Sequence, residues 1–323
     1  MSNHAKIIKI MNKEEQFKYI DENFPYSSGI HSKRRVRQDF FSSIDTELQA
    51  YLLGFYASDG NINEKRKTFR IHLEERDSEI VYLFKDVICP DARTFELKDR
   101  ICINPRNGKE YKGCNSFGVD INSSKICNDL VNLGFGYNKT YSENSLPSIK
   151  KELIRHFIRG YFDGDGTISG AYVKPDPKWK KNENFRSYAS ICCKTRKLLD
   201  EIQAFFLENG IKSTICMDKR DQMYVLSVAK LKLPKLFKLF YEGSNFYLKR
   251  KYEKFNHFVN TEVSQLIAEY RNAQKVNASD SNNPSTSVEH PTGVNMCAEL
   301  TGNCENSEIK SSEDNIIEDS LKS

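Results

Sequence analysis

Two similar stretches, LLGFYASDGNI at 52–62 and IRGYFDGDGTI at 158–168, decide the fold of this chain. Their Asp-Gly pairs lie 106 residues apart, and a segment that recurs after such a distance indicates an internal repeat. Before each Asp-Gly pair, apolar residues recur at three- and four-residue spacing, which is typical of a helix with one apolar face. We therefore expect two related halves, each opened by a helix that ends at an aspartate.

The segments that follow the two helices also correspond to each other. Strand-like alternation of apolar and polar residues occupies 67–75 and 184–193, and a helical pattern follows each of them at 77–88 and 195–210. Two further strands and a closing helix are expected at 93–103, 114–122 and 123–134 in the first half and at 212–218, 222–229 and 231–243 in the second. This order predicts an α+β fold made of two pseudo-symmetric αββαββα repeats.

The repeat and the composition divide the chain into four parts. We expect a basic N-terminal extension over 1–40, a first repeat over 41–147, a second repeat over 148–260 and a tail over 261–323. The tail is rich in Asn, Ser, Glu and Thr and poor in large apolar residues, so it is predicted to be disordered.

The charge of the chain is distributed unevenly. Residues 271–323 hold nine acidic against four basic residues, so residues 1–270 carry +10 although the whole chain carries +5. A basic body is an electrostatic footprint for a polyanion, although it also fits plain solubility.

Other features exclude several classes of protein. Since no run of eighteen apolar residues occurs, we expect no membrane span, and the charged start MSNHAKIIKIMNKEEQ does not resemble a secretion signal. We therefore expect an intracellular protein, with its compartment left open. The nine cysteines form no CxxC pair, which argues against a zinc module, and their odd number argues against a disulfide framework.

The two predicted helices share a ridge of small residues at four-residue spacing. The ridge consists of Ala50, Gly54 and Ser58 in the first helix and of Gly160 and Gly164 in the second. A glycine inside a helix costs about 1 kcal/mol relative to alanine, and close approach of two helices is the usual reason for accepting that cost. We expect Gly54, Ser58, Gly160 and Gly164 to form the interface between the helices. Arg159 is expected to lie off this ridge and to tolerate replacement by alanine.

Packing through this ridge would bring Asp59 and Asp165 side by side. An acid at a helix C-terminus is electrostatically unfavourable, and two such acids repel each other unless a cation lies between them. Carboxylate oxygens at a partly open site favour Mg²⁺, or Mn²⁺, and such a site suits phosphodiester hydrolysis. The alternative is that each Asp-Gly pair merely ends a helix, which two copies in register make less attractive.

At these residues the sequence resembles a known family. LLGFYASDG (52–60) and IRGYFDGDG (158–166) are similar to the two LAGLIDADG motifs of double-motif homing endonucleases, and the resemblance covers roughly residues 40–258. Arg159 replaces a consensus alanine, and Ala57 replaces the sixth-position acid that Asp163 retains. The eighth-position acid, a metal ligand in the family, is present in both copies. The resemblance implies a saddle-shaped monomer that lays its sheets in major grooves and cuts both strands, leaving short 3′ overhangs.

The resemblance also implies a lysine near each metal. The run GFGYNKTYSENSLP at 134–147 assigns this position to Lys139, and NFYLKRKYEKF at 245–255 assigns it to Lys251, with Lys249 as the alternative. A cation beside the scissile phosphate would stabilise transition-state charge or perturb the attacking water. A lysine in a basic protein can equally be solvated or contact a phosphate elsewhere.

Contacts to DNA are expected from alternate positions on the strands. The candidates for contacts to bases or phosphates are Arg70, His72, Arg186, Tyr188, Gln222 and Tyr224. Each of them is otherwise an ordinary residue on a solvent-facing strand. The basic segments KRRVR (33–37) and VKPDPKWKK (173–181), the latter with Lys178 and Lys180, are expected to grip the backbone. The first of these segments could instead act as a nuclear import signal.

Together these features predict a metal-dependent, site-specific endodeoxyribonuclease whose partner is double-stranded DNA with a long recognition site. Two alternatives keep the fold: a maturase that binds intron RNA, and a regulator that binds DNA without cutting it. The presence of both Asp59 and Asp165 favours the nuclease. An intein is not expected, because the chain lacks a splicing Cys or Ser at its start and a terminal His-Asn pair.

Overall fold

The computed structural model describes residues 11–29, 32–98, 101–103, 108–175, 177–179, 182–219 and 221–280. Lys180 and the predicted tail beyond residue 280 lie outside these residues. Within the described ranges, no helix combines the length and the apolar character that crossing a bilayer requires.

The first half contains one antiparallel sheet and the helices that pack on it. Its elements are α2 (Glu47–Asp59), β3 (Asn61–Asn63), β4 (Thr68–Glu74), the 3-10 turn η1 (Glu75–Asp77), α3 (Ser78–Ile88), β5 (Thr94–Leu97), β8 (Ser116–Asn122) and α4 (Ser124–Asn132). The sheet order is β3-β4-β8-β5. A two-stranded hairpin of β6 (Ile101–Ile103) and β7 (Glu110–Lys112) is inserted between β5 and β8.

The second half repeats this arrangement. Its elements are α5 (Lys151–Asp165), β9 (Gly166–Val173), the 3-10 turn η2 (Pro177–Trp179), β10 (Asn184–Cys193), α6 (Lys197–Glu208), β11 (Thr214–Asp218), β12 (Met223–Ala229), the 3-10 turn η3 (Lys230–Lys232), α7 (Leu233–Tyr241) and α8 (Lys249–Asn260). Its sheet order, β9-β10-β12-β11, matches that of the first half strand for strand. The predicted α+β fold with two αββαββα repeats is therefore confirmed.

Alternation along the strands separates the two faces of each sheet. In β4, Phe69 and Ile71 are buried while Arg70 between them is exposed, and in β10 Phe185 is buried beside the exposed Arg186. The apolar faces contribute to a hydrophobic core that runs through both halves without interruption. The opposite face of each sheet thus presents polar side chains.

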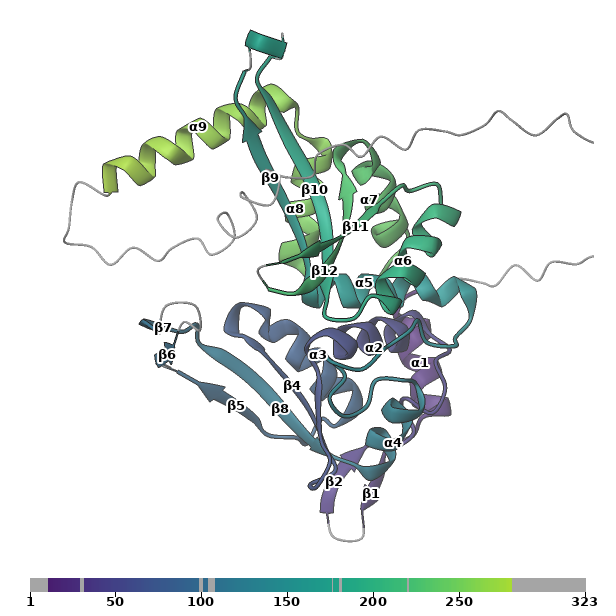
Figure 1. Ribbon diagram of the computed structural model, residues 1–323. Coiled ribbons are helices and arrows are strands. Elements are labelled where there is room, and N and C mark those ends of the chain that lie inside the picture. The colour runs from purple at the N-terminus through teal and green to yellow at the C-terminus, as the bar shows by residue number, and fades with distance from the viewer. Residues whose placement is uncertain are drawn as a thin grey trace, which may run out of the picture. The chain divides into compact units, whose positions relative to one another are not determined.

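The helices α2 and α5 lie side by side at the boundary between the halves (Figure 1). From Glu47 to Ala57 every residue of α2 is buried, which is the pattern of a helix surrounded by protein. The side chain of Thr46 accepts a hydrogen bond from the main-chain N–H of Gln49 (3.2 Å) and caps the start of α2. Helices this deeply buried can serve as a rigid base for the residues at their ends.

Within the predicted N-terminal extension, residues 13–23, 27–29 and 32–36 form regular structure that packs into the core. They form α1 (Lys13–Asn23), β1 (Ser27–Gly29) and β2 (Ser32–Val36), and this part of the chain adds Ile20 and Phe24 to the core.

Two arginines of the KRRVR run have structural roles. Arg37 is buried and donates to the main-chain oxygens of Phe24 (2.6 Å) and Val87 (2.9 Å). Arg35 forms a bidentate pair with Asp91, with both contacts at 3.0 Å. The expectation that the whole run grips DNA is therefore wrong for Arg37, and it is weakened for Arg35.

The predicted disorder from residue 261 onwards is wrong for residues 263–280, which form the helix α9 (Val263–Asp280). Leu266 and Ile267 are buried against Phe185, with Tyr172 and Phe258 around them. The average composition of the tail is polar, and the prediction of disorder relied on that average. It overlooked four apolar residues at helical spacing, namely Val263, Leu266, Ile267 and Tyr270.

A pair of truncations should separate α9 from the residues that follow it. A chain that ends at Asp280 should unfold at the same temperature as the full chain, because the remaining tail is poor in apolar residues. A chain that ends at Glu262 should lose about 2 kcal/mol of stability, because Leu266 and Ile267 no longer cover Phe185. Thermal unfolding followed by circular dichroism measures both, and equal midpoints for the two truncations would show that α9 does not support the core.

Candidate active site

The backbones of α2 and α5 touch at two glycines. A Cβ atom added to Gly54 would lie 1.9 Å from the main-chain oxygen of Phe157, and one added to Gly160 would lie 2.0 Å from that of Tyr51. A Cβ on Gly164 would lie 1.8 Å from Ser58 Oγ and 2.2 Å from Asp59 Oδ2. The structure thus places the four small residues singled out in the sequence along one line of contact.

This contact brings the two acids to the same end of the helix pair. Helix α2 ends at Asp59 and α5 at Asp165, and both side chains reach solvent. A glycine follows each acid because a Cβ there would meet an aromatic ring, at 2.0 Å from Tyr56 for Gly60 and at 2.2 Å from Phe162 for Gly166. The turn after each helix therefore requires glycine for space.

The surroundings raise the pKa of both carboxyl groups. Partial burial, together with the charge of Asp59, raises the pKa of Asp165 to about 6. Burial also raises the pKa of Asp59, although a hydrogen bond with the Ser58 hydroxyl (3.0 Å) opposes the rise. The charge of Asp59 thus contributes to the raised pKa of Asp165, and Asp59 has a hydrogen-bonding neighbour, Ser58, where the second repeat has Gly164.

A buried lysine lies beside each helix end. Lys139 Nζ donates to the main-chain oxygens of Ala57 (2.9 Å) and Ser58 (2.5 Å). Lys251 Nζ donates to those of Phe162 (2.8 Å), Gly164 (2.9 Å) and Gly166 (2.6 Å). Both ammonium groups therefore bind carbonyls of the last helical turn, where the helix dipole is negative.

Burial lowers the pKa of both lysines, that of Lys251 to about 8, while the nearby acids oppose the shift. All three ammonium protons of Lys251 have carbonyl partners, so this residue influences the acids through its charge rather than through a free N–H. Lys249, the alternative in the sequence, points away: its side chain is 73% exposed, with the Glu253 carboxylate at 3.8 Å.

The donor set fits a divalent cation held jointly with a substrate. Asp59 and Asp165 supply two hard oxygen ligands that are open to solvent, which is how Mg²⁺ is commonly bound together with water and phosphate oxygens. Among the described residues there is no group of three or more His, Cys, Asp or Glu side chains that could hold a metal by itself. Asp59 and Asp165 would hold the ion, and substrate oxygens would complete its coordination.

A groove of about 650 Å³ lies on the polar face of the first sheet. It is lined by Arg34, Arg66 and Arg70, by Asn61, Asn63 and Asn122, and by Thr68 and Asp120. The Asp120 carboxylate pairs with the guanidinium of Arg70 at 2.7 and 2.6 Å. Sequence reasoning found Arg70 but missed the asparagines of β3, although they directly follow the first Asp-Gly pair and pair with β4.

The other predicted DNA contacts are distributed as follows. His72 lies half-buried near Arg70, with Nε2 2.8 Å from Ser116 Oγ. Arg186 is exposed and Tyr188 half-buried on the polar face of β10, opposite Ala171 and Ser169 of β9. Lys178 is exposed in the turn η2.

Tyr224 does not lie on the polar face, so its expected place among the DNA-facing residues of the strand is wrong. It pairs with the buried Cys193 across the sheet and packs against the core. Gln222 precedes the strand in a turn, at a φ of 50°, so alternation counted from it does not apply to Tyr224. A shift of one residue in strand phase is enough to exchange the two faces.

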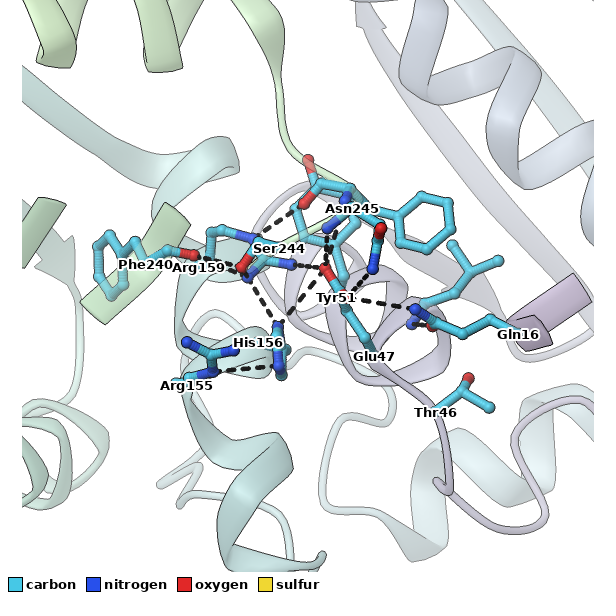
Figure 2. A network of polar contacts seen from close by, with 12 residues as sticks. Gln16, Thr46, Glu47, Tyr51, Arg155, His156, Arg159, Phe240, Ser244 and Asn245 are labelled. Atoms are coloured by element: carbon cyan, nitrogen blue, oxygen red, sulfur yellow. Dashed lines mark hydrogen bonds and ion pairs between the residues drawn. The ribbon is translucent and has the colours of Figure 1, made fainter. Parts of the chain in front are cut away.

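A network of buried polar contacts lies around Glu47, at the start of α2 and away from the acids (Figure 2). Glu47 Oε1 accepts from Arg159 Nη2 (2.7 Å) and from the main-chain N–H of Asn245 (2.7 Å). Its Oε2 accepts from the side chains of Asn245 (2.9 Å) and Gln16 (3.2 Å). The network joins α1, α2, α5 and the segment that follows α7.

Arg159 lies off the glycine ridge, as expected, but it is central to this network, so the structure does not support the expectation that its replacement by alanine is mild. Its side chain is completely buried and also donates to the main-chain oxygens of Phe240 (2.8 Å) and Phe246 (2.9 Å). In the repeat, Glu47 and Arg159 correspond to Leu153 and Leu53. The ion pair between the halves therefore occurs once, from Glu47 of the first half to Arg159 of the second, and the repeat has no equivalent pair.

His156 should make stability depend on pH. It is buried, and its Nδ1 accepts a hydrogen bond from Arg159 Nη1 (2.7 Å). Burial and the charges of Arg159 and Arg155 lower the pKa of His156, so the folded protein keeps it neutral while the unfolded chain takes up a proton below about pH 6.5. Its contribution is complete above that pH and is lost as the pH falls, by about 2 kcal/mol at pH 5.

His156→Gln keeps an acceptor that does not titrate in this range, so this variant should lose less stability than the parent between pH 7 and pH 5. Urea unfolding at each pH measures the difference, and His257→Gln, at a side chain 43% exposed, is the control. If the parent and His156→Gln lost the same stability, protonation of His156 would not be the cause.

Comparison with known proteins agrees with this architecture. Residues 152–239 match the family model described as a LAGLIDADG-like domain, which spans most of α5 and continues into α7. An uncharacterized protein of Methanocaldococcus jannaschii is 23% identical over 186 residues, which are 55% of this chain and 60% of that protein. The chain thus spans less than two thirds of the length of this relative.

Solved structures of homing endonucleases also align with the chain. Mesophilic variants of I-DmoI are 16% identical, with 65% of this chain and 97% of that chain covered and a TM-score of 0.40. The LAGLIDADG homing endonuclease I-SmaMI bound to cleaved DNA is 14% identical, with 74% and 95% covered and a TM-score of 0.42.

The family match lies in the second half. The first half repeats both its motif, ending at Asp59 as the second ends at Asp165, and its order of helices and strands. The second half thus matches a LAGLIDADG-like domain over residues 152–239, and the first half has the same order of helices and strands.

Proposed function

We propose that this protein is a site-specific endonuclease that hydrolyses both strands of double-stranded DNA. Asp59 and Asp165 would form its active site. The observation that carries the proposal is the placement of two solvent-reaching carboxylates at adjoining helix ends, each beside a buried lysine. A bound Mg²⁺ or Mn²⁺ would supply a Lewis acid for the attacking and leaving oxygens. Since one chain carries both acids, it would act as a monomer.

The residues of the chain have distinct parts in this reaction. Asp59 and Asp165 would hold the ion, which would supply Lewis-acid chemistry at the scissile phosphate. Lys139 and Lys251 offset the negative charge of the two helix ends, which reduces the repulsion that an approaching phosphate would meet. Because their ammonium groups are already bound, they need not reorganise during the reaction.

Recognition is assigned to the polar faces of the two sheets. In the first half, Arg66, Asn61 and Asn63 lie in the groove beside Arg70, where amide and guanidinium groups can reach base edges. In the second half, Arg186 and Tyr188 occupy the corresponding face. Two such faces on either side of the acids would span a long site, and the charge of +10 over residues 1–270 would favour binding to its phosphates.

Recovery of cleaved ends tests the proposal. The full chain is incubated with sheared genomic DNA and with a library of randomised duplexes, and new ends are ligated to adaptors and sequenced. With Mg²⁺ or Mn²⁺ the ends should converge on one sequence with short 3′ overhangs, and EDTA should abolish them. Site-specific binding without new ends under any of these conditions would contradict cleavage and would favour the DNA-binding regulator.

A further inference from the structure

The segment between α7 and α8 is held by acids from both halves of the protein. Glu47 Oε1 accepts from the main-chain N–H groups of Asn245 (2.7 Å) and Phe246 (3.2 Å). Asp163 Oδ2 accepts from the main-chain N–H of Leu248 (2.8 Å), the residue from which α8 starts. No side chain of α8 itself caps this start, so its main-chain N–H groups bind carboxylates from elsewhere: Asp163 at Leu248, and Glu79, whose Oε1 accepts from Lys249 (3.2 Å).

Asp163 is 1% exposed and lies two residues before Asp165. The Tyr51 hydroxyl donates to its Oδ2 (2.9 Å), and the Tyr241 hydroxyl lies 3.5 Å from its Oδ1. Its donors therefore come from α2, α7 and the start of α8. A buried carboxylate is costly unless it is hydrogen-bonded and faces a cation, and the nearby cations here are Lys251 and, with a smaller effect, Arg159.

The position of Lys251 depends on the same helical turn. The main-chain N–H of Lys251 donates to the oxygen of Leu248 (3.0 Å), so Leu248 and Lys251 share the first turn of α8. From that turn the ammonium group reaches the three carbonyls at the end of α5. Fixing Leu248 thus fixes the point from which Lys251 extends.

The first half has no equivalent of the carboxylate that holds the start of α8. Ala57 stands where the second repeat has Asp163, and Lys139 lies in a turn rather than on a helix. The two lysines therefore reach equivalent helix ends from different supports.

We propose that Asp163 is a positioning residue, which holds the first turn of α8 so that the ammonium group of Lys251 stays at the end of α5 beside Asp165. Its importance for cleavage rests on the proposed function, whereas the positioning of Lys251 does not. Removal of Asp163 should release Lys251 and leave Lys139 in place.

Competitive acetylation of the full-length protein with acetic anhydride, read by mass spectrometry, tests the positioning. Asp163→Ala introduces the residue that the first half already has. It should raise the reaction rate of Lys251 by about tenfold or more, since a hydrogen bond to a charged group is worth at least that factor. Lys139 serves as the internal control, and its rate should stay within about twofold by the same measure. Equal acceleration of both lysines, or of neither, would overturn the proposal.

Two further variants keep the test decisive if Asp163→Ala does not fold. Asp163→Asn retains an oxygen that can accept from Leu248, so it should accelerate Lys251 less than Asp163→Ala but still more than Lys139. Tyr51→Phe removes a hydroxyl from Asp163 and leaves its bond to Leu248, so both lysines should react as in the parent. Selective acceleration of Lys251 by Tyr51→Phe, or its absence in Asp163→Asn, would contradict the assignment.

The role in cleavage is measured separately, on a supercoiled plasmid that carries the recovered site. Asp163→Ala should accumulate nicked circles, because one of the two half-sites is impaired. It should add no further defect to Lys251→Met, since Asp163 acts through that lysine. An unchanged yield of linear plasmid would overturn the role in cleavage. If the parent cut no DNA, the proposed function would fail, and acetylation would still decide the positioning.

Discussion

Asp165→Asn should abolish double-strand cleavage while leaving DNA binding in place. The substitution preserves the shape of the side chain and removes one of the two charged oxygen ligands available to a divalent cation. We expect the rate of plasmid linearisation to fall at least about a thousandfold, which corresponds to about 4 kcal/mol of transition-state stabilisation. Asp59→Asn should have the same effect, because Asp59 ends α2 as Asp165 ends α5.

Binding and stability are the controls for this prediction. Fluorescence anisotropy at fixed salt should give a dissociation constant close to that of the parent, because the basic contacts to the phosphates are unchanged. Stability without metal should not fall either. The pKa of Asp165 is raised to about 6, so its charge becomes unfavourable to the folded state as the pH rises towards that value, and asparagine removes that charge. Cleavage at the parental rate by either variant would disprove the role of these acids.

Gly160→Leu should destabilise the protein strongly and should inactivate whatever remains folded. Even a Cβ at this position would lie 2.0 Å from the main-chain oxygen of Tyr51 and 2.9 Å from the main-chain nitrogen of Phe55. Backbone atoms cannot move aside independently of their helix, so α2 and α5 must separate. We expect a loss of about 3 kcal/mol or more in urea unfolding, at or beyond the upper end of the usual cost of overpacking.

Separation of the helices should also move the acids apart. A displacement of about 1 Å can cost about a hundredfold in rate, so cleavage should fall even at temperatures where the variant is folded. The matched control is Ala204→Leu, which enlarges a small residue on the exposed side of α6 and should change stability by less than about 0.5 kcal/mol. Equal stability of the two variants would show that the helices do not depend on this contact.

Arg159→Ala is unsuitable as a mild control, although Arg159 is the direct neighbour of Gly160. Its removal leaves Glu47 buried without the cation that it pairs with at 2.7 Å. Breaking a buried pair from one side costs about 3–5 kcal/mol. We therefore expect Arg159→Ala to destabilise the protein about as much as Gly160→Leu.

The features that sequence predicted well are those encoded within short segments. The ends of α2 and α5 could be predicted because apolar spacing, small residues and an Asp-Gly pair coincide within about ten residues, twice. The faces of β4 and β10 follow from strict alternation around Phe69 and Phe185. These patterns reflect local geometry, which each segment carries in its own residues.

The features that sequence missed depend on partners far along the chain. Arg159 appeared to be a replaceable polar residue beside the ridge because its partner Glu47 lies 112 residues away. Arg37 lies in a basic run of the sequence, but its guanidinium donates hydrogen bonds to main-chain carbonyls of α1 and α3. Spacing within a segment indicates which face a residue occupies, but it does not indicate what covers that face.

The sense of the Glu47–Arg159 pair limits how halves of such proteins can be recombined. A chimaera that joined this second half to a foreign first half would bury the Arg159 guanidinium opposite whatever replaces Glu47. If that residue were apolar, as Leu153 is at the corresponding place, the guanidinium would have no carboxylate to neutralise it. Two copies of the second half would meet the same difficulty twice. Exchange of either half would therefore succeed only if the residues at positions 47 and 159 were transferred together.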